Sequence, residues 1–381
     1  MQCSCPTIAY RLPGINPQTG KHYPPQSFRD FFKIFGGQLS ITGLDRRVQI
    51  MTDYYNACPE GYEAVLMPCK RCLNCTRNYR RSWSMRLCHE ASTCGDSMFL
   101  TLTVDDRYLD DVFPKRPGSV FNSLDHRPFQ LFFKRLRKLF DKGFSYKYYP
   151  PYTSNKLLPV LPRNVETRFY QAKKIKYYMC GEYGDNTHRP HYHACIFGAR
   201  FPDALFAKKK NGVAYYSSEI LKSLWPYGEM SLFSDVNPRS AAYVAGYVDK
   251  KLDTDRRFYD DVGVMPEYVR MSQGLGLDYL KEHCDDMYRF TSDGKYFDEA
   301  FFNGDFRSAA PSYYDEKFRL LRPERYDILV SSRESRTLER RRLIHVDEAL
   351  NVAGRVHAVR LARKPVRESA GEYLTCIMRQ S

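Results

Sequence analysis

An α+β fold, in which helices flank a central antiparallel sheet, is predicted by three features of the sequence. Short apolar or Thr-rich stretches bounded by Gly or acidic residues are typical of strands. Two of these stretches are joined by a short polar connection, which predicts an antiparallel hairpin. Amphipathic stretches that begin near Pro and stop at Gly predict helices between the strands. This order of elements favours a sheet covered by helices.

The individual elements follow one another along the chain. The predicted strands are SMFLTLTVDD (97–106), KKIKYYMCGEYG (173–184), RPHYHACIFG (189–198) and EMSLFSDV (229–236). The predicted helices are a basic stretch ending near Ser92, an amphipathic basic segment from Pro128 to Gly143, and the segments 217–228 and 238–252. The α+β domain is therefore expected to span residues 58–255, with a Cys-rich basic segment at its start. Residues 1–57 are expected to be a loop-rich extension, and residues 256–381 a basic, mainly helical region.

The composition predicts an acidic partner. The chain has 381 residues, a net charge of +15, a pI near 9.2 and 30 tyrosines. Such a charge suits nucleic acid, an anionic membrane surface or an acidic protein, and the aromatic residues among the cations favour nucleic acid. The sequence shows neither a signal peptide nor an apolar stretch of about 20 residues. No membrane partner is therefore expected, and the 12 cysteines are expected to be thiols or metal ligands in a reducing cytosol.

The segment GEYGDNTHRPHYHACIF (181–197) carries a candidate metal site. His191 and His193 are two apart on a predicted strand, so their side chains point to one face. The hairpin turn brings Glu182 toward them. Two imidazoles and a carboxylate can hold a divalent cation that polarises a phosphate. The alternative is a half-buried strand with two structural histidines, and His188 is expected to be a turn residue.

The helix SAAYVAGYVDKKL (240–252) carries two candidate nucleophiles. Tyr243 and Tyr247 are four residues apart and share a helix face, with Lys250 three residues further on. A tyrosine hydroxyl, whose pKa is ordinarily near 10, can attack phosphorus when a metal and a cation assist it. The alternative is that both tyrosines are core aromatics at helical spacing.

Taken in order, the FLTLTVDD strand, the E-x8-H-x-H hairpin and the Y-x3-Y-x2-K helix resemble the HUH endonucleases, which initiate rolling-circle replication. The segments YVAGYVDKK, PCKRCLNCTRNYRRSWSMRLCHEAS and RMSQGLGLDYLKEH are similar to segments of the replication initiators of gokushoviruses, small single-stranded DNA phages. The resemblance implies an HUH-type domain in which Glu182, His191 and His193 hold one Mg²⁺ or Mn²⁺ ion. It implies that Tyr243 and Tyr247 are the nucleophiles and that Lys250 assists them.

The resemblance further implies a reaction, partners and a location. A tyrosine would nick single-stranded or origin DNA, keep the 5′ end as a phosphotyrosine and release a 3′-OH for a host DNA polymerase. The ends would later be rejoined. No P-loop motif is present, so a host helicase would unwind the DNA, and the protein would act in the bacterial cytoplasm.

One position departs from the family pattern. Some double-tyrosine initiators have a lysine three residues after the first tyrosine, where this chain has Gly246. A nearby ammonium lowers the pKa of a phenol. We therefore expect Tyr247→Phe to impair the first nick more than Tyr243→Phe.

The cysteine stretch predicts a structural Zn²⁺ site. Cys69, Cys72 and Cys75 supply three thiolates, and Cys58 or Cys88 would complete a tetrahedral set. The alternatives are reduced thiols packed at a helix start, or an iron–sulfur cluster.

DNA contacts are predicted from cations on two stretches. The candidate residues are Arg71, Arg77, Arg80 and Arg81 beside the cysteines, and Lys134, Arg135 and Arg137 on the 128–143 helix. Two other functions fit part of this pattern: a non-catalytic, zinc-stabilised nucleic-acid-binding protein, and a metallohydrolase that uses water. Only the tyrosine endonuclease uses both the histidine pair and the tyrosine pair.

Overall fold

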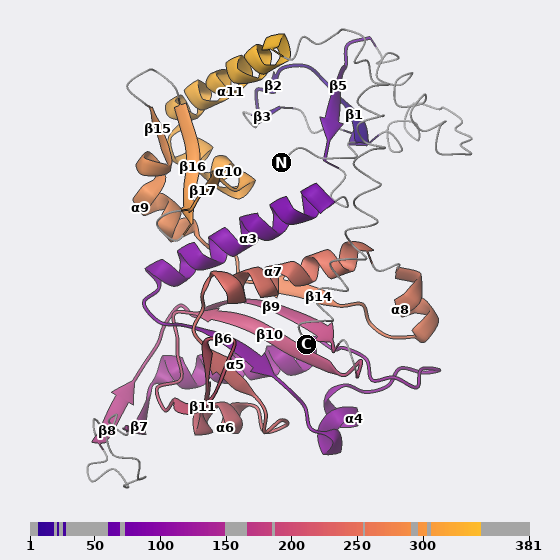
Figure 1. Cartoon of the computed structure of the whole chain (residues 1–381), viewed down its shortest axis with the longest axis vertical. Coiled ribbons are helices and arrows are strands. Elements are labelled where there is room, and N and C mark those ends of the chain that lie inside the picture. The colour runs from indigo at the N-terminus through magenta and orange to yellow at the C-terminus, as the bar shows by residue number, and fades with distance from the viewer. Residues whose placement is uncertain are drawn as a thin grey trace. The chain divides into compact units, whose positions relative to one another are not determined.

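The computed structural model describes residues 7–18, 21–22, 26–27, 60–68, 73–148, 166–184, 187–253, 256–290, 296–302 and 306–343. The chain divides into two compact units, Tyr79–Ser332 and a unit that combines Met1–Asn78 with Arg333–Ser381. The Tyr79–Ser332 unit contains the predicted sheet and the helices that cover it (Figure 1).

A seven-stranded antiparallel sheet forms the centre of this unit, in the order β11-β12-β13-β6-β10-β9-β14. Its strands are β6 (Ser97–Leu102), β9 (Lys176–Tyr183), β10 (Pro190–Phe197), β11 (Leu205–Lys210), β12 (Val213–Ser217), β13 (Leu232–Ser234) and β14 (Tyr268–Met271). Every neighbouring pair is antiparallel. The predicted α+β class is therefore confirmed, and so is the predicted hairpin, which is formed by β9 and β10.

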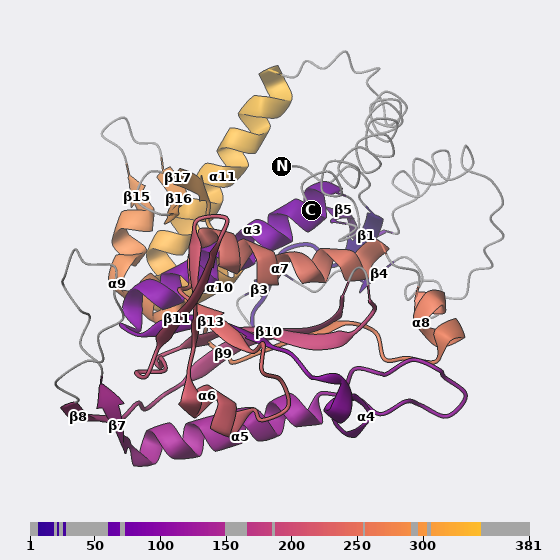
Figure 2. The same ribbon diagram turned by 60° about the horizontal axis from the view of Figure 1, so that its bottom comes forward.

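Helices cover both faces of the sheet. They are α3 (Leu73–Thr93), α5 (Arg127–Lys142), α6 (Glu219–Leu224) and α7 (Pro238–Asp253). Because side chains alternate between the faces of a strand, two apolar layers form. Leu100 and Ile196 belong to the layer beneath α5 and α6, whereas Phe99 and Cys195 belong to the layer beneath α3 and α7. Figure 2 shows α5 and α6 on one side of the sheet and α7 on the other.

Helix α5 packs through an apolar stripe. Its buried side chains recur every three or four residues: Phe129, Phe132, Phe133, Leu136 and Phe140. Burying each phenylalanine contributes about 1.5–3 kcal/mol. Gly143 follows at φ 78°, a conformation that favours glycine, and the helix ends there as predicted.

The region after residue 255 contains more β structure than predicted. Strand β14 joins the sheet beside β9, so the sheet extends past the predicted end of the domain. The later elements are α8 (Arg256–Val262), α9 (Leu277–Met287), β15 (Tyr288–Phe290), β16 (Tyr296–Phe302), β17 (Phe306–Ala309), α10 (Ser312–Leu321) and α11 (Pro323–Leu343). A second core around Met85, Leu280, Tyr314 and Phe318 joins α3, α9 and α10. The predicted "mainly helical" region is therefore mixed.

Several short elements fall where loops were expected or no element was predicted. They are β1 (Thr7–Arg11), β2 (Ile15–Asn16), β3 (Lys21–His22), β4 (Gln26–Ser27), β5 (Glu63–Met67), η1 (Asp106–Tyr108), α4 (Leu109–Val112), β7 (Phe144–Tyr148) and β8 (Glu166–Tyr170). Strand β11 also escaped prediction because all six of its side chains are exposed, which leaves no buried alternation to detect. The segment RDFFKIFGG (29–37), expected to form a short helix or strand, lies outside the described residues. None of the described helices combines the length and apolar composition that crossing a bilayer requires.

Candidate metal centre and tyrosine helix

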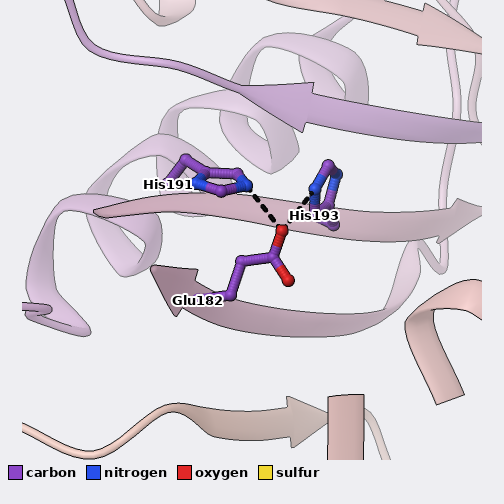
Figure 3. Close-up of side chains that lie close together, drawn as sticks. All are labelled: Glu182, His191 and His193. Carbon is purple, nitrogen blue, oxygen red and sulfur yellow. Dashed lines mark hydrogen bonds and ion pairs between the residues drawn. The ribbon is translucent and has the colours of Figure 1, made fainter. Parts of the chain in front are cut away.

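The β9–β10 hairpin brings the predicted histidines and glutamate together. His191 lies directly opposite Glu182 in the register, and His193 lies two residues further along β10. Residues two apart on a strand share a face, so both imidazoles project to the same side of the sheet. Figure 3 shows the three side chains converging on one point.

One carboxylate oxygen meets both rings. Oε1 of Glu182 is 2.6 Å from Nε2 of His191 and 3.0 Å from Nε2 of His193. Nδ1 of His191 lies 3.0 Å from the carbonyl oxygen of Arg189, and Nδ1 of His193 lies 2.9 Å from the Thr101 hydroxyl. A carbonyl oxygen only accepts, so Nδ1 of His191 carries a proton. Its short contact between Nε2 and the carboxylate then needs a second proton or a cation.

Burial and charge oppose one another in this cluster. Glu182 is 3% exposed and His193 is 7% exposed. Burial alone would raise the pKa of Glu182, but hydrogen bonds from both histidines lower it below the ordinary value. Burial alone would lower the pKa of His191, but the hydrogen bond and charge of Glu182 raise it. The carboxylate is therefore ionised at neutral pH, as a metal ligand must be.

The cluster fits a divalent cation. Ligand atoms of Glu182, His191 and His193 all lie within 4.8 Å of one another. The second carboxylate oxygen of Glu182, Oε2, is buried and has no hydrogen-bond partner in the described structure. A buried acceptor left unsatisfied is costly, and a bound cation would satisfy it. Two imidazoles and a carboxylate suit a first-row transition ion such as Mn²⁺ better than Mg²⁺, which prefers oxygen ligands.

Tyr243 on α7 lies against this cluster. Its ring centroid is 5.2 Å from that of His193 and 6.2 Å from that of Phe99, both edge-on. The residue is 44% exposed, so it is not a core aromatic. Tyr247 and Lys250 lie on the same helix, but their side chains lie outside the described structure. Of the predicted nucleophiles, the structure therefore shows Tyr243 beside the predicted metal ligands.

Arg80 on α3 occupies the space above Gly246. Its Nε donates to the carbonyl oxygen of Ala242 over 2.9 Å, and a Cβ at Gly246 would lie 3.0 Å from the guanidinium carbon. The position where some relatives carry a lysine is thus filled by a guanidinium from another helix. The expected ranking of Tyr247 above Tyr243 assumed that no cation lies beside the Tyr243 turn, and that reason no longer holds.

The predicted DNA-binding cations fall into different places. Lys134, Arg135 and Arg137 lie on α5, on the face of the sheet opposite the histidines. Arg135 donates to the Leu224 carbonyl oxygen over 3.0 Å and Arg137 to the Ile175 carbonyl oxygen over 2.7 Å. These two arginines therefore tie α5 to its neighbours.

The predicted cations beside the cysteines lie at the start of α3 or before it. Arg77 is exposed on this helix, whereas Arg80 and Arg81 are partly buried. Arg71 lies outside the described residues. Arg80 is thus the predicted cation that the structure shows in contact with the tyrosine helix.

Most of the predicted zinc site lies outside the described residues: Cys58, Cys69 and Cys72. Cys75 is buried near the start of α3. Cys88 follows 13 residues later on that helix, a rise of about 20 Å. It packs in the apolar layer beneath α3 and α7, where burial raises the pKa of its thiol to about 12. Cys88 therefore does not complete a site that contains Cys75, and Cys58 remains the predicted fourth ligand.

Sequence reasoning missed two residues beside the cluster. Thr101 pairs with His193 across β6 and β10 and contacts its ring nitrogen. Glu267, 7% exposed, accepts from the Tyr183 amide over 2.9 Å, and its charge helps to raise the pKa of His191. The alternating threonines of FLTLT could have suggested Thr101, but nothing near Glu267 in the sequence marks it.

An α+β domain with a buried two-histidine, one-carboxylate cluster beside a tyrosine helix is a class of site suited to phosphate chemistry. Residues 97–252, which contain this domain, match the protein family described as Replication-associated protein ORF2.

Three curated relatives agree with the family match. The chain is 33% identical over 190 residues to Replication-associated protein VP4 of Bdellovibrio phage phiMH2K, covering 49% of this chain and 48% of that protein. It is 28% identical over 285 residues to Replication-associated protein ORF2 of Spiroplasma virus 4, covering 73% and 77%. It is 27% identical over 238 residues to Replication-associated protein ORF4 of Chlamydia phage 1, covering 58% and 49%.

The chain thus spans about half the length of two of these relatives and about three quarters of the third. No solved structure matches it significantly. The predicted resemblance to phage replication proteins is confirmed.

Proposed function

We propose that this chain initiates phage DNA replication as an HUH-type endonuclease that cuts single-stranded DNA with a tyrosine. The carrying observation is the position of Tyr243, whose ring lies 5.2 Å from that of His193 in the Glu182–His191–His193 cluster. The match of residues 97–252 to replication-associated proteins supports the same function. A cluster that served only the fold would not explain why an exposed tyrosine lies over it.

In the proposed reaction, the Tyr243 hydroxyl oxygen attacks the scissile phosphorus. A phosphorus–tyrosine oxygen bond forms, the bond from phosphorus to the 3′ oxygen breaks, and the tyrosine proton ends on the released 3′-OH. The 5′ end stays on the protein as a phosphotyrosine. In the later step a 3′-OH attacks that phosphotyrosine, which restores the diester and frees the tyrosine. Each step exchanges one phosphate ester for another, so the bond energy is conserved.

The cluster residues would hold the metal and fix its position. Glu182, His191 and His193 supply the ligands, while the Arg189 carbonyl and Thr101 orient the imidazoles. A bound Mn²⁺ or Mg²⁺ ion supplies Lewis acidity to a non-bridging phosphate oxygen. The protein itself aligns the tyrosine with that phosphate.

We further propose that Arg80 performs for the Tyr243 turn what Lys250 performs for Tyr247. The Arg80 guanidinium is fixed on the turn from Ala242 to Gly246, and a cation beside a phenol favours its ionised form. Tyr243 would then make the first nick, and Tyr247, four residues later on α7, would make the second. A host polymerase would extend the free 3′-OH, and a host helicase would unwind the template.

Covalent capture tests the proposal. Overlapping single-stranded oligonucleotides that cover the genome encoding the chain are incubated with the full-length protein and Mn²⁺ or Mg²⁺. We expect one oligonucleotide to give a denaturation-resistant adduct, absent with EDTA and absent from the Tyr243→Phe, Tyr247→Phe double variant. Cleavage without an adduct would instead indicate a metallohydrolase that uses water. Binding without cleavage would indicate the non-catalytic, zinc-stabilised binding protein.

A further inference from the structure

A buried arginine without an acidic partner lies away from the metal cluster. Arg86 on α3 is 8% exposed. Its guanidinium is stacked between two aromatic rings, 4.0 Å from the centroid of Trp83 and 3.7 Å from that of Tyr313. Its Nε donates to the carbonyl oxygen of Leu275 over 3.1 Å. The side chain is therefore held in one orientation from three sides.

No described residue neutralises this charge. Arg86 forms no ion pair within the described part of the chain. Glu90, one turn further along α3, is already bound to the ammonium of Lys176 and to the amide of Gly276, each over 2.7 Å. Burial lowers the pKa of Arg86, which reflects the cost of desolvating the charge. Buried charges in proteins are ordinarily paired, so an unpaired one points to an anion that is supplied from outside.

The guanidinium opens into a cavity of about 550 Å³. Its lining combines Trp83 and Arg86 of α3, Gln273 of the β14–α9 loop, and Tyr313 and Lys317 of α10. No aspartate or glutamate lines the cavity. Lys317 lies 5.6 Å from the Tyr313 ring, and neither Lys317 nor Gln273 has a hydrogen-bond or ion-pair partner among the described residues. Two cations, two aromatic rings and a free amide are the groups that bind a phosphate and a base.

This cavity shares a sheet face with the metal cluster. The Trp83 ring lies 5.0 Å from that of Tyr178 on β9. Tyr178 and Glu182 are four residues apart on that strand and therefore point to the same face. Their separation along the strand is about 13 Å. One strand of DNA that crosses this face can therefore approach both sites.

We propose that this cavity, here called the Arg86 cavity, binds one phosphodiester group and its neighbouring base of the single-stranded DNA whose cleavage is proposed above. Arg86 and Lys317 contact the phosphate, and an exposed part of the aromatic lining contacts the base. The inference rests on the proposed function for its choice of DNA. The physical argument requires only an anion.

Lys317→Gln tests the Arg86 cavity without disturbing the core, because Lys317 is only partly buried. Binding of a fluorescent thymidine oligonucleotide of roughly 16 residues is measured by anisotropy across a salt series. Each lost phosphate contact on a single strand should reduce the slope of log K against log salt by about 0.7. We expect that reduction and a roughly threefold to tenfold weaker affinity at low salt. The matched control is Lys138→Gln, which removes the same charge from exposed α5 on the opposite face of the sheet. It should bind like the wild type.

Trp83 provides a second readout, because the chain contains only two tryptophans. The oligonucleotide should quench fluorescence that is absent from the Trp83→Phe variant. Arg86→Gln, with its fold checked by circular dichroism, should abolish this quenching. Inorganic phosphate and thymidine monophosphate serve as probes of the free-anion alternative. Quenching by either of these but not by the oligonucleotide would overturn the DNA assignment.

Binding and cleavage separate the two proposals. If Lys317→Gln lowers the salt slope while no adduct ever forms, the Arg86 cavity is a DNA site and the endonuclease proposal fails. If adducts form but Lys317→Gln and Lys138→Gln give the same slope as the wild type, the Arg86 cavity proposal is wrong and the endonuclease proposal stands.

Discussion

Thr101→Val removes one hydroxyl from beside His193 and leaves the three proposed metal ligands in place. Thr101 pairs with His193 across β6 and β10, and its hydroxyl lies 2.9 Å from Nδ1 of that histidine. Valine has nearly the same shape, so the strand pairing is expected to survive. The imidazole would lose the partner that fixes its tautomer and orientation.

The size of the effect follows from the one hydrogen bond that is lost. A net contribution of about 0.5–1.5 kcal/mol for a neutral hydrogen bond corresponds to a change of roughly twofold to twelvefold in a binding constant. Outer partners of metal-binding histidines typically change metal affinity by about 10–100-fold. The ranges overlap near tenfold. We therefore expect the Kd for Mn²⁺ to rise about tenfold.

Calorimetric titration of Mn²⁺ into metal-free protein measures this directly. Adduct formation should be slower at limiting Mn²⁺ and recover at saturating Mn²⁺, because Thr101 contacts the ligand and not the DNA. Thr101→Ser keeps the hydroxyl and should bind Mn²⁺ like the wild type. Thr103→Val, two residues along, removes a hydroxyl that lies 3.5 Å from Ser231 Oγ and should leave the affinity unchanged. An unchanged Kd in Thr101→Val, or equal loss in Thr101→Ser, would refute the reasoning.

Four further outcomes are expected. His191→Ala or His193→Ala should abolish cleavage and leave DNA binding by anisotropy largely intact; parallel loss of both with the fold preserved would exclude a ligand role. Peptide mass mapping after a single turnover should find the first adduct on Tyr243, and an adduct only on Tyr247 would restore the ranking drawn from the sequence. Arg80→Gln should slow that first adduct roughly tenfold or more, as expected for loss of about 1.5–3 kcal/mol from a charged hydrogen bond, whereas unchanged rates would leave Arg80 a structural role. Mn²⁺ affinity should fall as the pH falls through the raised pKa of His191, which lies above 6.5 because its carboxylate partner outweighs burial. The metal-free protein has the opposite sign: the stabilising effect of this histidine is complete below pH 6.5 and is lost as the pH rises through that pKa, and urea unfolding at pH 6 and 9 with EDTA measures it.

The metal cluster could be predicted from the sequence because it depends on local geometry. A hairpin with a short turn places residues of its two strands opposite one another, and the two-residue period sets both histidines on one face. His188 was also correctly expected in the turn, where it adopts φ 51°. Helix α5 was equally predictable, because its phenylalanines repeat at helical spacing.

Features that depend on distant segments could not be predicted. Thr101 and Thr103 are alike in the sequence, and only the pairing of β6 with β10 shows that Thr101 faces His193. Arg80 and Gly246 are 166 positions apart, and their contact depends on how α3 packs against α7. Strand β14 has only four residues, too few to establish an alternating pattern. Each of these follows from tertiary packing and not from a local pattern.

The net charge of +15 predicted a nucleic-acid partner, but it did not identify which cations meet the nucleic acid. The structure separates them by what each guanidinium already contacts. Arg135 and Arg137 donate to carbonyl oxygens of neighbouring segments, so their charge is partly used in holding the fold. Arg80 and Arg86 also donate through Nε to a carbonyl oxygen, yet neither has an acidic partner among the described residues. Fixing one nitrogen while leaving the terminal pair available pre-organises a guanidinium for a bidentate phosphate contact. Both arginines come from α3, six positions apart, and α3 packs on the sheet face that carries the histidines. Helix α3, and not the more obviously basic α5, is therefore the element we expect to guide the DNA strand.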